Sequence, residues 1–287
     1  MSKRKNIIAY LFFGLILIIG VGIILYPSFS SWWNSRVQSQ AIANYDRAVS
    51  NLGDEEKKKI FERAERYNEE LSALPSPFSD YGSVKGYDSI LDITGTGIMG
   101  YITIPKINVY LPIYHGTSPE VLNVAVGHLQ GSTLPIGGNS RHSVISAHRG
   151  LPSSRLFTDI DQLVEDDVFT VTILDEVYTY SVDSTTVVLP TDLGGLAIVP
   201  DEDNVTLMTC TPYGINTHRM LVKAHRIYTD TPHEVRVPTD ATAIDKMSCL
   251  PVIIVAAVVL LILFWMIQGR LNRHFGLAEE FENSKKD

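Results

Sequence analysis

The sequence predicts a mainly β domain, folded as a sandwich or a closed barrel, with a helical extension before it and an apolar segment near each terminus. Between residues 97 and 228, short runs rich in Val, Ile, Thr and Tyr alternate with Gly, Pro, Asn and Asp, which is typical of short strands joined by turns. Charge-free apolar runs occupy residues 7–26 and 250–267, and each can cross a hydrocarbon core of about 30 Å. Residues 46–71 are highly charged and have helical periodicity.

The composition excludes several classes of protein. The chain has 287 residues, of which 45% are hydrophobic and 20% charged, so it can form one domain of ordinary size with accessory segments. A net charge of -8 argues against a nucleic-acid partner, because phosphate binding needs a surplus of Lys and Arg on one face. The two cysteines, Cys210 and Cys249, cannot form a disulfide framework, and Cys249 adjoins an apolar run. This favours a functional thiol at Cys210.

The first apolar run is predicted to be a retained membrane helix. Lys3, Arg4 and Lys5 precede it, which places the amino terminus in the cytoplasm and the residues that follow outside. Trp32 and Trp33 lie where an aromatic belt would be. A cleaved signal peptide is the alternative, but the run is longer than a signal h-region and no Ala-x-Ala site follows it.

The charged stretch at residues 46–71 is predicted to be an amphipathic helix that leads away from the bilayer. Its apolar positions recur at helical spacing: Ile60, Ala64, Tyr67 and Leu71. Pro75 and Pro77 end the helix, and residues 76–85 form a loop before the main domain.

The main domain contains seven or eight predicted strands and two short helices. Its strands are predicted at residues 100–104, 109–113, 143–147, 168–174, 176–188, 205–209 and 219–228, and its helices near residues 119–124 and 156–163.

The second apolar run is predicted to return the chain to the cytoplasm, since Arg270, Arg273 and His274 follow it. A buried helix of the globular domain is the alternative, although a core helix normally has a polar stripe. Both termini are then cytoplasmic and the main domain lies outside the membrane. The predicted segments are a cytoplasmic tail with the first membrane helix (1–27), a helix and loop (28–96), the catalytic domain (97–232), a linker (233–249), the second membrane helix (250–268) and a cytoplasmic tail (269–287).

Three polar side chains at strand ends are the candidate catalytic residues. The predicted strand before Cys210 stops at a thiol followed by Pro, and a thiol needs a base to ionise it and a donor to hold the oxyanion it creates. The run 143–147 ends at His148, so imidazole and thiol can meet at one rim of a barrel. Arg219 opens the next strand, so we expect it to lie across a hairpin from Cys210.

Taken singly, these residues also have structural interpretations. His148 alone could be a hydrogen-bonded loop histidine, and Arg219 alone could form a surface salt bridge. No metal or cofactor site is predicted, because the other histidines lack the spacing of zinc ligands: His115, His128, His142, His218, His225 and His233. The acidic triplet at residues 201–203 is interpreted as a solvated turn.

The motifs around these side chains resemble a known family. Residues 206–219, Thr-Leu-Met-Thr-Cys-Thr-Pro-Tyr-Gly-Ile-Asn-Thr-His-Arg, resemble the TLxTC active-site strand and downstream arginine of sortases. Gly-His-Leu at 127–129, Leu-Pro-Ile-Gly-Gly at 134–138 and the run 142–151 around His148 resemble the class C, or pilus-associated, branch of these membrane-anchored cysteine transpeptidases. The resemblance covers about residues 97–228.

The resemblance implies an eight-stranded sortase-type β-barrel and a reaction. Cys210 would be the nucleophile, His148 the general acid and base, and Arg219 the group that stabilises the oxyanion or positions the substrate. The substrate would be an LPxTG-like sorting signal of a Gram-positive pilin, cleaved between Thr and Gly through a thioester that a pilin Lys amine resolves to an isopeptide bond. Class C members also carry a lid, Asp-Pro-aromatic, and Ser76, Pro77 and Phe78 stand at that place here, so the ion pair of the lid is lost.

Other functions stay open beside pilin polymerisation. A sortase that attaches surface proteins or pili to cell-wall peptide would share the acylation step. A non-catalytic membrane scaffold for pilus assembly would need neither thiol nor imidazole. A papain-like hydrolase fits less well, because its Cys precedes its His and lies on a helix. The expected partners are pilins, the Lys acceptor and membrane lipid, with no nucleic acid.

Overall fold

The structure, a computed structural model, describes residues 2–228. Residues from Ser30 onward belong to one compact unit, and the segment up to Phe29 belongs to another. The predicted linker, the second membrane helix and the carboxy-terminal tail lie outside the described residues, as does Cys249. The predicted barrel is confirmed: eight strands close in the order β1-β2-β3-β4-β7-β8-β6-β5.

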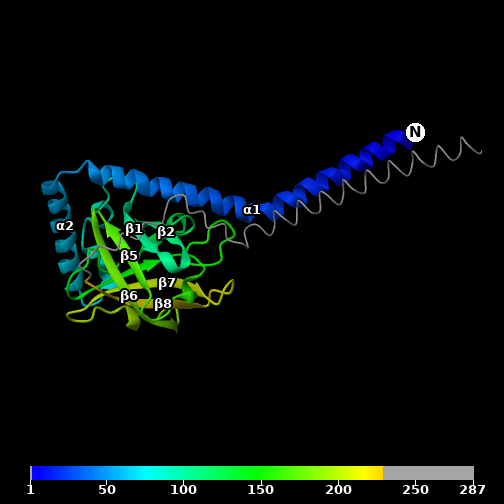
Figure 1. Ribbon diagram of the computed structural model, residues 1–287. Coiled ribbons are helices and arrows are strands. Elements are labelled where there is room, and N and C mark those ends of the chain that lie inside the picture. Colours follow the sequence, from blue (N-terminus) through cyan, green and yellow to red (C-terminus); the bar gives the residue numbers. More distant parts are fainter. Residues whose placement is uncertain (1, 229–287) are drawn as a thin grey trace, which may run out of the picture. The chain divides into compact units, whose positions relative to one another are not determined.

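Two long helices precede the barrel. α1 (Ser2–Ser50) contains the first apolar run, and its segment from Gly14 is long and apolar enough to be a candidate membrane span. The prediction of one helix over residues 46–71 is wrong, because α1 ends at Ser50 and α2 (Asp54–Ser72) starts after Gly53. Three acidic residues in the first turn of α2 suit the positive end of a new helix dipole, which favours a restart there. Figure 1 shows α2 beside the strands of the barrel.

The strands agree with the predicted ones to within a few residues and include one more. Their bounds are β1 (Ile98–Ile104), β2 (Val109–His115), β3 (Val126–His128), β4 (Arg141–Ser146), β5 (Val168–Ile173), β6 (Glu176–Val188), β7 (Asp203–Thr211) and β8 (His218–Arg226). The extra strand, β3, has three residues and pairs parallel to β2 and antiparallel to β4. So short a strand carries no alternation for a sequence pattern to detect.

The remaining elements are short helices and turns. They are α3 (Pro77–Asp80), α4 (Pro119–Leu122) and the 3₁₀ turns η1 (Tyr81–Ser83), η2 (Tyr87–Ser89), η3 (Pro105–Ile107), η4 (Ile160–Gln162) and η5 (Gly194–Leu196). α4 confirms the predicted helix near residues 119–124. The predicted helix at 156–163 is wrong, since only η4 forms there. The loop predicted at 76–85 contains α3 and η1.

The alternation of side chains along the strands separates the barrel interior from its outer face. Ile145, Leu207 and Val222 are fully buried in the interior core. α1 and α2 add Tyr45 and Leu71 to the same core, so the helical extension is an integral part of the folded unit. The Tyr45 hydroxyl donates to the Met99 carbonyl at 2.8 Å and accepts from the Leu174 amide at 2.8 Å, which satisfies it inside the core.

A fully buried histidine joins this extension to the barrel. The ring of His128 donates from Nε2 to the Thr133 carbonyl at 2.8 Å, and its Nδ1 accepts from the hydroxyl of Tyr87 at 2.9 Å. Both ring nitrogens are therefore used by the neutral imidazole. Burial lowers the pKa of His128 from 6.5 to about 4.

His128 should make folding stability depend on pH in the mildly acidic range. The unfolded chain protonates this ring below pH 6.5, whereas the folded one stays neutral down to about pH 4. Its contribution is therefore fully present above pH 6.5 and is lost as the pH falls toward 4, by up to about 3 kcal/mol. Urea unfolding at pH 7 and at pH 4.5 measures this loss. His128→Gln keeps a donor for Thr133 but cannot be protonated in this range, so the free energy of unfolding should differ less between the two pH values. An equal pH slope in this variant and the parent would assign the effect elsewhere, for instance to His142, whose pKa burial also lowers.

Candidate active site

Three neighbouring strands bring His148, Cys210 and Arg219 to one end of the barrel. β4 and β7 are parallel with Ser146 paired to Met208, so His148, just beyond β4, and Cys210, near the end of β7, lie two residues further on at the same level. β7 and β8 are antiparallel, and Cys210 pairs directly with Arg219. Cys210 and Arg219 are therefore neighbours across the β7–β8 hairpin, as the sequence predicts.

Two contacts fix the level of His148 beside β7. The Ala147 amide donates to the Met208 carbonyl at 3.1 Å. The hydroxyl of Thr209, which is buried, donates to the Ala147 carbonyl at 2.8 Å. Both backbone polar groups of the residue before His148 are therefore held by the strand that carries Cys210.

Cys210 and Arg219 lie on the outer face of the barrel. Leu207 and Val222 point into the core, so the alternation of β7 and β8 turns Cys210 and Arg219 outward. Each of the three residues is half-buried. The site is therefore open to a substrate that approaches from outside.

The three side chains differ in how they are held. Nη1 of Arg219 donates to the carbonyls of His218 at 3.2 Å and Asn216 at 3.4 Å, which leaves the rest of the guanidinium available. Within residues 2–228, neither the Cys210 thiol nor the His148 imidazole forms a hydrogen bond with a protein group. Catalytic hydrogen bonds are often long before a substrate is bound, so this is compatible with a site that tightens on binding.

The loop after His148 touches the loop after Cys210. The ring of Tyr213 lies against Gly150, where a Cβ atom would come within 2.7 Å of the ring, and Gly150 has a φ of +75°. Arg149 places its guanidinium 6.0 Å from the centre of the same ring and pairs with Asp161. Any residue larger than glycine at position 150 would push the two loops apart.

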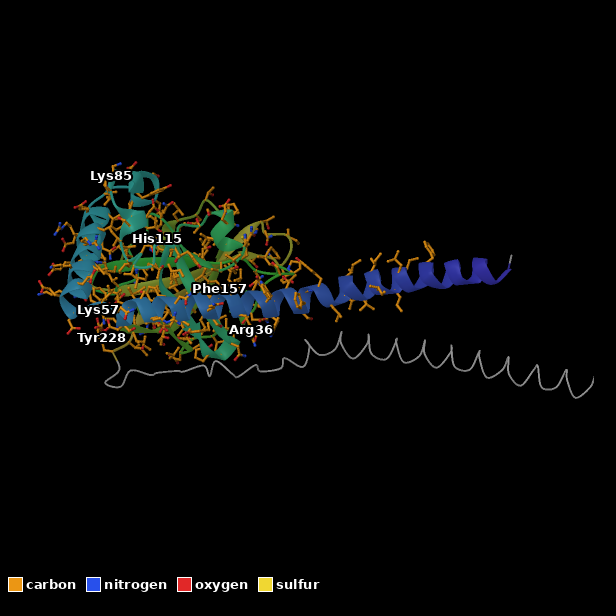
Figure 2. All side chains as sticks on the ribbon, turned by 90° about the horizontal axis from the view of Figure 1, so that it is seen from above. Arg36, Lys57, Lys85, His115, Phe157 and Tyr228 are labelled. Carbon is orange, nitrogen blue, oxygen red and sulfur yellow. The ribbon has the colours of Figure 1, made fainter. Side chains whose placement is uncertain are left out.

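The same loop is fastened to α1. Nδ2 of Asn34 donates to the Ser153 carbonyl at 2.8 Å, and buried Gln38 donates to the hydroxyl of Ser154 at 3.4 Å and to the carbonyl of Val124. Figure 2 shows α1 with Arg36 labelled and, in the loop after His148, Phe157. The sequence pattern does not indicate these contacts, because Asn34 and Gln38 lie in a helix far along the chain from residue 148.

An apolar group, here called the outer patch, adjoins the three candidate residues. Its centre is Val144, Leu196 and Leu221, which are buried. Met208, two residues before Cys210, packs against it together with Leu129, Val188 and Phe78. The patch thus continues along the strands from the level of Cys210.

The predicted lid residues lie at the outer patch. Ser76 is exposed and precedes α3 without a side-chain capping bond, whereas Pro77 and Phe78 are half-buried. The backbone of Phe78 rests on Gly131, where a Cβ atom would lie 2.7 Å from the Phe78 Cα and 2.9 Å from the Pro77 carbonyl oxygen. Gly131 also has a φ of +93°. Both the close approach of Phe78 and this backbone conformation therefore favour glycine at the position.

Other polar groups that the sequence singled out lie away from this site. His225 pairs with Asp183, Glu202 pairs with Lys223, and the carboxylate of Asp203 accepts from the Gly138 amide at 3.0 Å. In the described part of the chain, no three His, Cys, Asp or Glu side chains gather as metal ligands.

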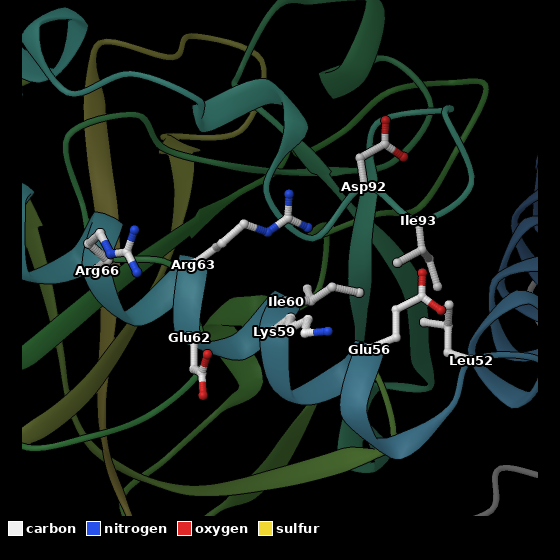
Figure 3. A pocket seen from close by; sticks show the side chains of 9 residues that line it. All are labelled: Leu52, Glu56, Lys59, Ile60, Glu62, Arg63, Arg66, Asp92 and Ile93. Carbon is white, nitrogen blue, oxygen red and sulfur yellow. The ribbon is translucent and has the colours of Figure 1, made fainter.

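A pocket beside α2 is also separate from the three candidate residues (Figure 3). It is lined by Leu52, Glu56, Lys59, Ile60, Glu62, Arg63, Arg66, Asp92 and Ile93. Acidic and basic side chains alternate around it, and the pocket includes no residue of β4, β7 or β8. It offers no concentrated charge and no nucleophile.

Comparison with known proteins agrees with this arrangement. Residues 102–227 match the family model described as Sortase domain. The crystal structure of sortase C1 from Streptococcus agalactiae is 50% identical, with a TM-score of 0.60, and the match covers 67% of this chain and 100% of that one. Clostridium perfringens sortase C, solved with the C-terminal cell wall sorting motif, is 40% identical with a TM-score of 0.58, and the match covers 67% of this chain and 100% of that one.

A curated relative is more distant. Sortase D of Bacillus subtilis (strain 168) is 29% identical over 114 residues, which are 40% of this chain and 54% of that protein. The match therefore spans about half the length of this relative. The family assignment rests on the sequence identity to the solved structures and on the full coverage of their chains. The chain belongs to the sortase family, in its class C, pilus-associated branch.

Proposed function

We propose that this protein is a cysteine transpeptidase that cleaves an LPxTG-like sorting signal between Thr and Gly and joins pilin subunits through an isopeptide bond. The direct pairing of Cys210 with Arg219, beside His148 on the neighbouring parallel strand, is the observation that carries the proposal. Membership in class C and the Clostridium perfringens relative, solved with the C-terminal cell wall sorting motif, support the substrate class.

The proposed residues divide the reaction into two steps. The Cys210 thiol passes its proton to His148 as its sulfur attacks the Thr carbonyl carbon, while Arg219 donates to the oxygen that becomes negative. His148 protonates the departing Gly amine, the Thr–Gly bond breaks, and a thioester remains. A Lys amine of another pilin then attacks the thioester, loses its proton to His148, and releases the thiol as the isopeptide bond forms.

Mass spectrometry of the full-length protein mixed with a sorting peptide tests the first step. We expect an adduct on Cys210 with the mass of the peptide up to Thr, and none in Cys210→Ala. A peptide that is cleaved by Cys210→Ala, or an adduct on another residue, would overturn the proposal.

The acceptor distinguishes pilin polymerisation from attachment to cell-wall peptide. Incubation with a pilin whose linking Lys is changed to Ala should abolish the ladder of polymers. Continued laddering would instead support a different amine, and pilus assembly that survives Cys210→Ala would support a non-catalytic scaffold.

The proposed location is the outer surface of the membrane. The apolar part of α1 is the candidate anchor, and the Lys and Arg residues before it favour a cytoplasmic amino terminus. Protease treatment of intact cells should cut the barrel and spare a tag at residue 1.

Ser76, Pro77 and Phe78 are proposed to form a lid held by shape and not by charge. Phe78 packs on the outer patch beside the site, and Gly131 seats its backbone. Because Ser76 is exposed and cannot form an ion pair, apolar contact must hold the segment in place.

Opening of this lid should be visible in the reactivity of Cys210. We expect Phe78→Ala and Gly131→Ala each to raise the rate of Cys210 alkylation by iodoacetamide about threefold to tenfold, since either change removes roughly 1 kcal/mol or more of packing. Gly82→Ala is the matched control, because a Cβ atom there meets nothing within 4 Å. An unchanged rate in Phe78→Ala would show that the ring does not cover the thiol.

A further inference from the structure

We propose that His142 and Thr206 determine how tightly the sorting signal binds, because together they fasten the loop between β6 and β7 over the outer patch. This inference rests on the proposed function for the identity of the ligand. The fastening itself is a property of the free protein.

The fastening consists of one buried histidine between a loop and a strand. His142 is 1% exposed and Thr206 is fully buried. Nδ1 of His142 lies 2.8 Å from the carbonyl of Ala197, and Nε2 lies 2.8 Å from the hydroxyl of Thr206. A carbonyl can only accept, so Nδ1 carries the proton and Nε2 accepts from Thr206. Burial lowers the pKa of His142, which favours this neutral form.

The histidine holds the loop at the place where the loop meets the outer patch. Ala197 directly follows η5, whose Leu196 is 3% exposed and packs with Val144 and Leu221. Leu189 and Leu193 are exposed, and the end of the loop is held where the Asp201 amide donates to the Ser140 hydroxyl at 2.9 Å. Leu196 and Ala197 therefore attach the middle of the loop to the sheet.

Outward-facing residues of β4 and β7 lead in a row from this attachment to the candidate catalytic residues. Along β7 the order is Thr206, Met208 and Cys210, and along β4 it is His142, Val144, Ser146 and His148. A peptide whose Thr carbonyl reaches Cys210 and whose preceding apolar residues lie on the outer patch would pass beside this loop, which buried Leu196 holds in place as a wall. A loosened wall would weaken binding of the peptide without moving Cys210, His148 or Arg219.

Thr206→Val tests the inference, because valine keeps the shape of threonine and removes the hydroxyl. In the full-length protein without substrate, we expect amide hydrogen exchange of residues 189–202 to accelerate about tenfold, with exchange in β4 and β7 unchanged. KM for a sorting peptide should rise about tenfold while kcat changes less than twofold. Thr206→Ser keeps the hydroxyl and should restore both values, whereas His142→Ala should reproduce the loss.

Each result bears on a different part of the inference. Unchanged exchange in Thr206→Val and His142→Ala would overturn the fastening. Faster exchange with an unchanged KM would overturn the role of the loop in binding. Absence of any turnover by the parent protein would instead count against the proposed function, and the exchange data would still decide whether His142 fastens the loop.

Discussion

Arg219→Lys is expected to lower the rate of thioester formation at Cys210 by roughly 10²–10³-fold, with little change in KM. Arg219 pairs directly with Cys210, and two backbone carbonyls of its hairpin anchor Nη1. The planar guanidinium can keep these bonds while its other nitrogen donates to an oxyanion, whereas an ammonium offers one shorter point charge. The loss should therefore appear mainly in the chemical step.

Single-turnover mass spectrometry of the Cys210 adduct measures this rate directly. Lys223→Arg is a suitable control, because Lys223 lies on the same strand and outer face, four residues from Arg219. Thermal unfolding should show both variants to be as stable as the parent. A change of less than threefold in Arg219→Lys would remove Arg219 from the proposed oxyanion site.

Asn68→Ala should destabilise the barrel unit by about 4 kcal/mol, because it leaves two buried backbone groups without partners. Asn68 is fully buried on α2, donates to the Leu134 carbonyl at 3.1 Å and accepts from the Leu134 amide at 2.7 Å. This pair of bonds ties the helical extension to the segment before β4. For a unit of this size, the expected fall in melting temperature is about 8–16 °C.

Differential scanning calorimetry of the full-length protein measures this effect. Asn44→Ala makes the same chemical change at an exposed position of α1 and should shift the transition by less than about 2 °C. If the two variants melt at the same temperature, the bonds to Leu134 do not hold the extension in place.

The strands and the pairing of Cys210 with Arg219 could be predicted from the sequence because both depend on local patterns. β6 shows the typical β-rich composition over its whole length, and its predicted bounds, residues 176–188, agree with the structure. A short loop between two predicted strands placed Cys210 opposite Arg219 without any knowledge of the rest of the barrel.

Features that depend on distant parts of the chain could not be predicted in this way. His142 has no nearby partner in the sequence, and its role arises only where β7 and the loop after β6 fold against it. The role of Gly131 likewise depends on Phe78, 53 residues earlier, whose backbone packs on it. The break between α1 and α2 was missed because helical periodicity continues on both sides of Gly53.

The outward direction of Cys210 depends on the alignment of β7 with its two neighbours. A slip of one residue against β4 or β8 would turn the sulfur toward the centre of the barrel and carry Leu207 into water. Once Cys249 is replaced by Ser, Cys210 therefore becomes a probe of correct assembly: after refolding, a thiol-specific dye should label molecules whose strands are aligned, and should miss compact but misaligned ones.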